Sequence, residues 1–129
     1  MPAESSRMKN ILLIEDEEGL VSVMSSVLED EGFAVKALFT AEEALQLNES
    51  FSPDLIISDI RMKGIDGFTL FEIMKALERF CHIPFIFLTA MDDRSSQQRA
   101  MKLGASAYIT KPFDVDELLG IVRKVLPAS

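Results

Sequence analysis

The sequence predicts a doubly wound α/β domain in which five parallel strands form one sheet and five helices cover its two faces. Short apolar runs alternate along the chain with stretches whose apolar residues recur at helical spacing. The first run, at 11–14, is apolar throughout, which is typical of a strand buried on both faces. A length of 129 residues with 48% hydrophobic content suits one compact core and is short for two.

The first three strands are expected at 11–14, 33–38 and 54–58. The first stops at an acidic run, 15–18, and the third runs directly into Asp59. The helix after the first strand ends at Gly32 and has one apolar face, made of Leu20, Met24, Val27 and Leu28. The helix after the second starts at an N-cap, Thr40, with Glu43 three residues on, and has a weak apolar face of Ala41, Ala44 and Leu45.

The remaining strands are expected at 84–88, ending at Thr89, and at 107–110, ending at Lys111 and Pro112. A loop with two glycines, Gly64 and Gly67, leads from Asp59 to a helix whose predicted buried stripe is Leu70, Ile73, Met74 and Leu77. A polar helix is expected at 92–103 with Gly104 at its end. The last helix has Asp114 as its expected N-cap and an apolar face of Leu118, Ile121, Val122 and Val125.

A chain of this length with this alternation suits the flavodoxin-like strand order 2-1-3-4-5. In that order the winding reverses beside the first strand, and a crevice opens at the carboxyl ends of strands 1 and 3. The domain is expected to cover 9–126. Residues 1–8 are expected to form a flexible N-terminal tail, and 127–129 a C-terminal tail or the start of a linker.

Composition limits the partners. Acidic residues outnumber basic ones by 21 to 13, a net charge of −8, and no basic run resembles a nucleic-acid or lipid site. No apolar stretch approaches the length that spans a bilayer, so a cytoplasmic protein is expected. The single cysteine, Cys81, is expected to be a structural thiol, because no ligand pair with metal-site spacing accompanies it.

Polar residues of a particular kind follow four of the predicted strands. Their positions are Glu15 and Asp16 after the first, Asp59 after the third, Thr89 after the fourth and Lys111 after the fifth. Because the carboxyl ends of parallel strands meet at one edge of a sheet, these side chains should lie together. Three carboxylates a few ångströms apart repel by about 4 kcal/mol per pair at a surface-like dielectric, so a cation is expected there. An oxygen-only ligand set favours Mg²⁺.

A magnesium site of this kind usually completes its shell with a phosphate. Asp59 is the candidate nucleophile, since a carboxylate can attack phosphorus to form an acyl phosphate and the central strand would fix its position. Thr89 would then donate a hydrogen bond to the phosphoryl oxygens, and Lys111 would supply a fixed positive charge. Taken singly, each residue has an ordinary explanation, such as a helix cap or a solvated charge. The prediction depends on the five together.

Several stretches resemble the response-regulator receiver family of two-component signalling. The matching segments are 14–17, the acidic motif of the first strand; 54–62, the phosphoacceptor strand; and 64–67, 88–90 and 108–113. The resemblance covers about 9–126. It implies that Asp59 is phosphorylated, that Asp16 and Asp59 bind Mg²⁺ directly, that Glu15 assists through water, and that the backbone carbonyl of Arg61 is a further ligand.

The same resemblance implies a mechanism and partners. Thr89 and Tyr108 would be the switch pair, and the bond before Pro112 would be cis. The phosphoryl donor would be a histidine kinase or a histidine phosphotransfer protein, and the receiver of the signal an unknown downstream protein or effector domain. The output surface would include the fourth helix, the fifth strand and the fifth helix, through which a phosphorylation-dependent homodimer could form.

Some positions depart from the family pattern or tune it. Lys63 stands where the family most often has proline, so the loop after Asp59 loses a rigid residue and gains a charge. Arg61 and Met91, two residues past Asp59 and Thr89, occupy positions through which family members tune the lifetime of the acyl phosphate.

Three other functions would each leave a different signature in the sequence. An aspartyl-nucleophile phosphohydrolase generally needs a second Asp two residues after the nucleophile, and that position is Arg61. A nucleotide- or flavin-binding domain would need a glycine-rich phosphate loop, which is lacking. A receiver fold that signals by protein contact without phosphorylation stays open, as does the question of whether the chain is a whole regulator or part of a larger one.

Overall fold

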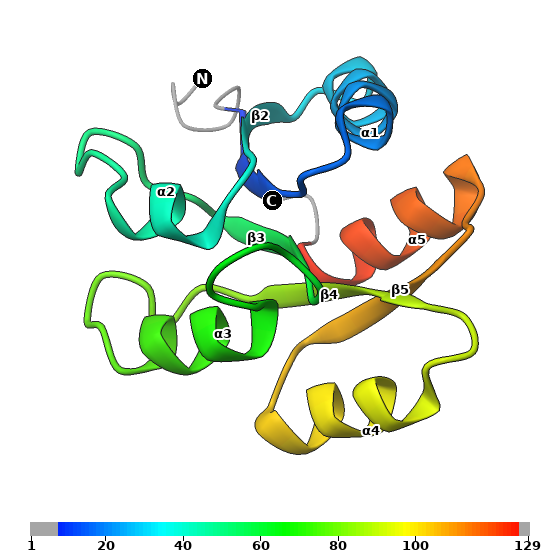
Figure 1. The fold of residues 1–129 in the computed structure, drawn as a ribbon. Helices are drawn as coiled ribbons and strands as arrows, with labels where there is room; N and C mark the ends of the chain where they lie inside the picture. Colours follow the sequence, from blue (N-terminus) through cyan, green and yellow to red (C-terminus); the bar gives the residue numbers. More distant parts are fainter. Residues whose placement is uncertain (1–7, 127–129) are drawn as a thin grey trace.

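The computed structural model describes residues 8–126, and in it one parallel sheet separates two layers of helices. The strands are β1 (Asn10–Ile14), β2 (Ala34–Leu38), β3 (Leu55–Asp59), β4 (Phe85–Ala90) and β5 (Ala107–Lys111). The sheet has the order β2-β1-β3-β4-β5, and every neighbouring pair is parallel. The predicted fold class and strand order are therefore confirmed (Figure 1).

The helices are α1 (Glu18–Asp30), α2 (Ala41–Leu45), α3 (Gly67–Lys75), α4 (Arg94–Leu103) and α5 (Val115–Val125). Helices α1 and α5 cover one face of the sheet, and α2, α3 and α4 cover the other (Figure 1). Each layer has its own core, because alternate residues of a strand point to opposite faces. Leu12, Ile14 and Ile56 pack in the α2–α4 core, whereas Ile11, Leu13 and Ile57 pack in the α1–α5 core.

Capping residues explain where several helices begin. Thr40 and Glu43 form a capping box at α2, and Asp114 and Glu117 form another at α5. Asp93 caps α4, so this helix starts two residues later than the sequence predicts, and Gly104 ends it in the left-handed region at φ 100°. The predicted caps Thr40 and Asp114 are confirmed.

The stripe predicted for α3 is only partly right. Phe68, Leu70, Phe71 and Met74 are its large buried side chains, while Ile73 is half-buried. Leu77 lies beyond the end of the helix and is 40% exposed, so the 3.6-residue period no longer places it on the core face. In α1, Val21 takes the buried place that the sequence assigned to Leu20.

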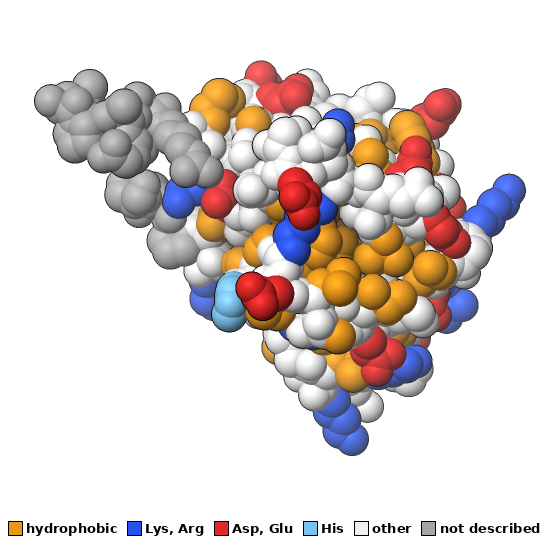
Figure 2. Space-filling model, turned by 90° about the vertical axis from the view of Figure 1, so that its left-hand side faces the viewer, with side chains coloured by type: hydrophobic (Ala, Val, Ile, Leu, Met, Phe, Trp, Pro, Cys, Tyr) orange, Lys and Arg blue, Asp and Glu red, His pale blue; other side chains and the backbone are white. Residues whose placement is uncertain are grey.

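The chain after the short helix α2 is held by an arginine from the α3–β4 connection. The Arg79 guanidinium donates to the carbonyl oxygens of Leu47 and Asn48 at 2.6 Å each, and to that of Phe51 at 3.0 Å. Carbonyls just past a helix end have no partner within the helix, and the guanidinium supplies one. This end of the molecule faces the viewer in Figure 2, where hydrophobic side chains gather between charged ones.

Among residues 8–126, no helix is long and apolar enough to cross a membrane. The predicted N-terminal tail, apart from Met8, and the C-terminal tail 127–129 lie outside the described residues.

Candidate functional site

The five polar residues singled out in the sequence lie at the carboxyl edge of the sheet. Glu15 and Asp16 directly follow β1, and Asp59 and Lys111 are the last residues of β3 and β5. Thr89 is the last buried residue of β4. Asp59, Thr89 and Lys111 line one cavity of about 130 Å³. Its size exceeds the space that a few waters occupy, so a phosphoryl-sized group can enter it.

Three carboxylates gather beside this cavity. Glu15, Asp16 and Asp59 each place an oxygen within 4.8 Å of the other two. Glu15 is 1% exposed and Asp59 is 8% exposed, whereas Asp16 lies in solvent. Like charges this close destabilise the chain unless a cation lies among them. The donors are all carboxylate oxygens, without histidine or cysteine, so the set fits Mg²⁺ and is a poor match for zinc or copper.

Lys111 supplies part of the compensating charge. Its Nζ donates to Glu15 Oε1 at 3.0 Å and to Asp59 Oδ2 at 3.2 Å. Burial alone would lower the pKa of Lys111, but the hydrogen bond to Glu15 and the charges of Asp59 and Glu15 raise it above 10.5. The ammonium is therefore charged at neutral pH and held between the two buried carboxylates.

The surroundings of Glu15 destabilise the ionised form of its carboxyl group. Burial raises the pKa of its carboxyl group above 4.5, and the charge of Asp59 raises it further. Hydrogen bonds from Lys111 and from the Glu17 backbone N–H, at 3.1 Å, oppose the rise without cancelling it. A cation bound to the cluster would oppose it as well, because it favours the ionised carboxylate.

Thr89 carries a hydroxyl without a partner. The residue is 3% exposed, and Oγ1 makes no hydrogen bond within the described part of the chain. A buried hydroxyl in this condition costs about 1–3 kcal/mol, which a ligand oxygen in the cavity would recover. The orphaned hydroxyl beside Asp59 thus indicates where an acceptor oxygen would fit.

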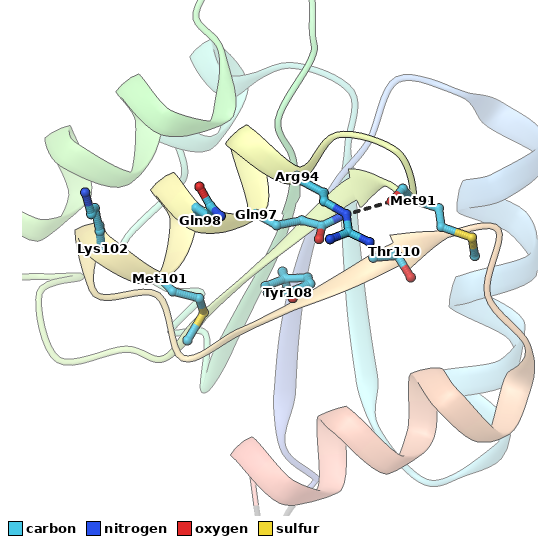
Figure 3. Close-up of a pocket in the computed structure, with 8 residues that line it drawn as sticks. All are labelled: Met91, Arg94, Gln97, Gln98, Met101, Lys102, Tyr108 and Thr110. Carbon is cyan, nitrogen blue, oxygen red and sulfur yellow. Dashed lines mark hydrogen bonds between the residues drawn. The ribbon is translucent and has the colours of Figure 1, made fainter.

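Tyr108 lies elsewhere. It is half-buried in β5, where it pairs with Phe87, while Thr110 is the residue opposite Thr89. A groove of about 850 Å³ lies between α4 and β5, and its lining includes Tyr108, Met91, Arg94 and Met101 (Figure 3). Here the Gln97 side chain donates to the Met91 carbonyl oxygen at 3.3 Å. The two residues of the expected switch are therefore on adjacent strands, one at the cavity and one at the groove.

The structure also brings in a residue that the sequence did not single out. Asp93, the N-cap of α4, accepts a hydrogen bond from Arg61 Nη2 at 3.0 Å, and both line the cavity beside Asp59. Hydrogen bonds from Ser96 and from the Arg61 guanidinium hold the pKa of the Asp93 carboxyl at about 2. The only sequence signal was its place four residues after Thr89, which does not reveal a partner on another loop.

The loop between β3 and α3 is held at two points. Gly67 lies against the start of this loop, and a Cβ on it would overlap the Asp59 carbonyl oxygen. Glu42, from α2, accepts a hydrogen bond from the Ile65 backbone N–H at 3.3 Å. Lys63 is exposed between these two points. After β5, the Lys111–Pro112 peptide bond is cis.

Comparison with known proteins identifies similar sequences and folds. Residues 11–123 match the family model described as the response regulator receiver domain. The heme response regulator HssR of Staphylococcus epidermidis is 40% identical over 92% of this chain and 52% of its own length. Sporulation initiation phosphotransferase F of Bacillus subtilis is 30% identical over 92% of this chain and 94% of its own length.

A solved structure gives the same result. The non-phosphorylated HemR receiver domain of Leptospira biflexa is 34% identical, with a TM-score of 0.83 over 94% of this chain and 96% of the other. The chain spans about half the length of several curated relatives that it matches.

Proposed function

The chain belongs to the response regulator receiver domain family, whose members are phosphorylation-activated signalling domains, and on that premise we propose that Asp59 is its phosphoacceptor. One observation carries the proposal. The buried Asp59 carboxylate belongs to an acidic cluster that favours a cation, accepts a hydrogen bond from the Lys111 ammonium, and lines a cavity open to a phosphoryl group. The domain limits that we propose are 9–126.

The proposed metal is Mg²⁺. Asp16 and Asp59 would bind it directly, Glu15 would act through water, and the Arg61 carbonyl would be a further ligand. When bound, Mg²⁺ would neutralise negative charge on the carboxylates and on the phosphoryl oxygens. The oxygen-only donor set and the raised pKa of Glu15 support this assignment.

The chain's own residues would then share the transfer. An Asp59 oxygen forms the new P–O bond as the P–N bond of the donor's phosphohistidine breaks, and the histidine leaves with the electron pair of that bond. Lys111, already 3.2 Å from Asp59, can donate to a phosphoryl oxygen with little movement. The Thr89 hydroxyl can donate to another oxygen, because it gives up no existing hydrogen bond to do so.

The signal would leave through the surface of α4 and β5. As Thr89 moves toward the phosphoryl group, Tyr108 would change its exposure in the neighbouring groove. We propose a histidine kinase or histidine phosphotransfer protein as donor and a downstream protein or effector domain as recipient. A phosphorylation-dependent homodimer through the face of α4, β5 and α5 is part of the proposal, as is the cytoplasmic location expected from the sequence. No nucleic-acid or membrane binding is proposed for this chain.

Receiver domains are switches rather than conventional enzymes, and the site supports that reading for this chain. A phosphohydrolase would need a second carboxyl group that exchanges protons near neutral pH. In such enzymes that group generally stands two residues after the nucleophile, and this chain has Arg61 at that position. We therefore propose that the chain catalyses only its own phosphorylation and dephosphorylation.

The test is beryllofluoride with Mg²⁺, which mimics a phosphoryl group on a carboxylate. Binding should shift the backbone amide signals of Thr89 and Tyr108 in NMR spectra of the intact protein. Asp59→Asn should abolish the shifts while leaving the fold intact. Unchanged spectra of the wild-type protein would refute the proposal.

A further inference from the structure

Arg61 and Asp93 join two loops at the mouth of the phosphorylation cavity. Arg61 follows β3, Asp93 precedes α4, and Arg61 Nη2 donates to Asp93 Oδ2 at 3.0 Å. Both residues line the same cavity as Asp59. The ion pair thus links the loop of the proposed phosphoacceptor to the start of α4.

Asp93 uses its two carboxylate oxygens for two different tasks. Oδ1 accepts from the Ser96 backbone N–H at 3.2 Å and from the Ser95 hydroxyl at 3.3 Å, which caps α4. Oδ2 is the oxygen that accepts from Arg61. A movement of the Arg61 side chain would therefore change a hydrogen bond of Asp93, the residue that caps the first turn of α4.

The Arg61 side chain is able to change partners. It is 81% exposed, and Asp93 is its one ion-pair partner among residues 8–126. A phosphoryl group carries close to two negative charges and three strong acceptor oxygens, against one charge on Asp93. A guanidinium matches phosphate in a two-pronged geometry, so a group on Asp59 would attract it strongly.

We propose that Asp93 and the phosphoryl group on Asp59 compete for Arg61, so that phosphorylation releases the first turn of α4 from the loop after β3. The inference rests on the proposed role of Asp59. It adds a path to α4 that does not pass through Thr89 and Tyr108. In this path Asp93 is a positioning residue, and Arg61 is the group that moves.

The experiment measures beryllofluoride binding by amide NMR, in Mg²⁺ buffer, for the wild type and two variants. Asp93→Asn keeps an oxygen that can cap α4 and removes the charge that holds Arg61, so affinity should rise about two- to fivefold. Arg61→Met removes the group under competition, so affinity should fall by a similar factor. In both variants the amides of 94–97 should already lie near their bound positions before beryllofluoride is added.

Asp114→Asn is the matched control, because it also removes a charge from an N-cap but at α5, outside the cavity. Its affinity should equal that of the wild type. Arg61→Lys, which keeps the charge and loses the planar fork, should give an affinity between those of Arg61→Met and the wild type.

The affinity for beryllofluoride is expected to change in opposite directions in Asp93→Asn and Arg61→Met, and this distinguishes competition from a structural role. If the ion pair only stabilised the loops, breaking it from either side would change affinity in the same direction. Equal shifts in Asp93→Asn and Arg61→Met, with normal binding by the wild type, would overturn the inference and leave the proposed function standing. A wild type that does not bind beryllofluoride would overturn both.

Discussion

Lys111 and Glu15, 96 residues apart in the chain, form the innermost ion pair of the site, with 3.0 Å between the ammonium and a carboxylate that is 1% exposed. Removing one partner of a buried pair leaves the other charge without compensation. Because Lys111 is 30% exposed, the cost should fall below that of a fully buried pair.

We expect Lys111→Met to lower the free energy of unfolding by about 1–3 kcal/mol at pH 7 in metal-free buffer. The pKa of Glu15 is already raised in the folded chain, so protonating Glu15 favours folding. This stabilisation is complete below the unfolded value of 4.5 and is lost as pH rises through the folded value. The defect should therefore shrink as pH falls from 7 toward 4.5, measured by urea unfolding. A defect that is constant with pH would contradict the explanation.

Asp16 tests the need for a cation. In metal-free buffer, Asp16→Asn should raise the free energy of unfolding by up to about 1 kcal/mol, because it relieves repulsion with Glu15 and Asp59. The same variant should lose most of the rise in melting temperature that Mg²⁺ gives the wild type. Glu49→Gln, exposed and outside the cluster, is the control and should keep the full response. A Mg²⁺ response that survives in Asp16→Asn would place the ion elsewhere.

Thr89→Val separates stability from signalling. The hydroxyl is buried and has no hydrogen-bond partner among residues 8–126, so replacing it with a methyl group should leave stability unchanged or raise it by about 1 kcal/mol. The variant should nevertheless lose the beryllofluoride-induced shift at Tyr108, measured by amide NMR. Thr110→Val, on the opposite position of β5 and outside the cavity, should keep that shift. Loss of stability in Thr89→Val would mean that its hydroxyl has a partner in the free protein.

The sequence predicts the sheet and the polar residues at its edge, because both follow from the periodicity of the apolar residues and from the order of the strands along the chain. A short apolar run such as 11–14 predicts a buried strand without reference to the rest of the fold. The parallel arrangement of the strands then brings Glu15 and Asp59 together. Contacts between loops do not follow from either rule. The Arg61–Asp93 pair joins residues 32 positions apart on two irregular segments, and only the folded loops reveal it.

The helix faces show the same limit. A period of 3.6 residues predicts which side of a helix is buried, but not where the helix stops, and Leu77 falls past the end of α3. Arg79 is another case, because its three carbonyl partners belong to a loop whose path no local pattern fixes.

Gly67 provides the last test, since a side chain at this position would meet the backbone of Asp59 and Ile60. A Cβ at this position would overlap the Asp59 carbonyl oxygen and lie 2.9 Å from Ile60 Cα, and neither backbone atom can rotate away. Gly67→Ala should therefore lower the free energy of unfolding by about 1–3 kcal/mol, the usual cost of overpacking, and should weaken beryllofluoride binding because Asp59 is displaced. Gly120→Ala, in α5, should instead raise stability by up to about 1 kcal/mol, because within residues 8–126 the new Cβ would have no atom within 4 Å beyond its chain neighbours and its own helix backbone. Urea unfolding of the two variants gives the comparison, and equal stabilities would show that the approach of Gly67 to Asp59 is looser than the structure indicates.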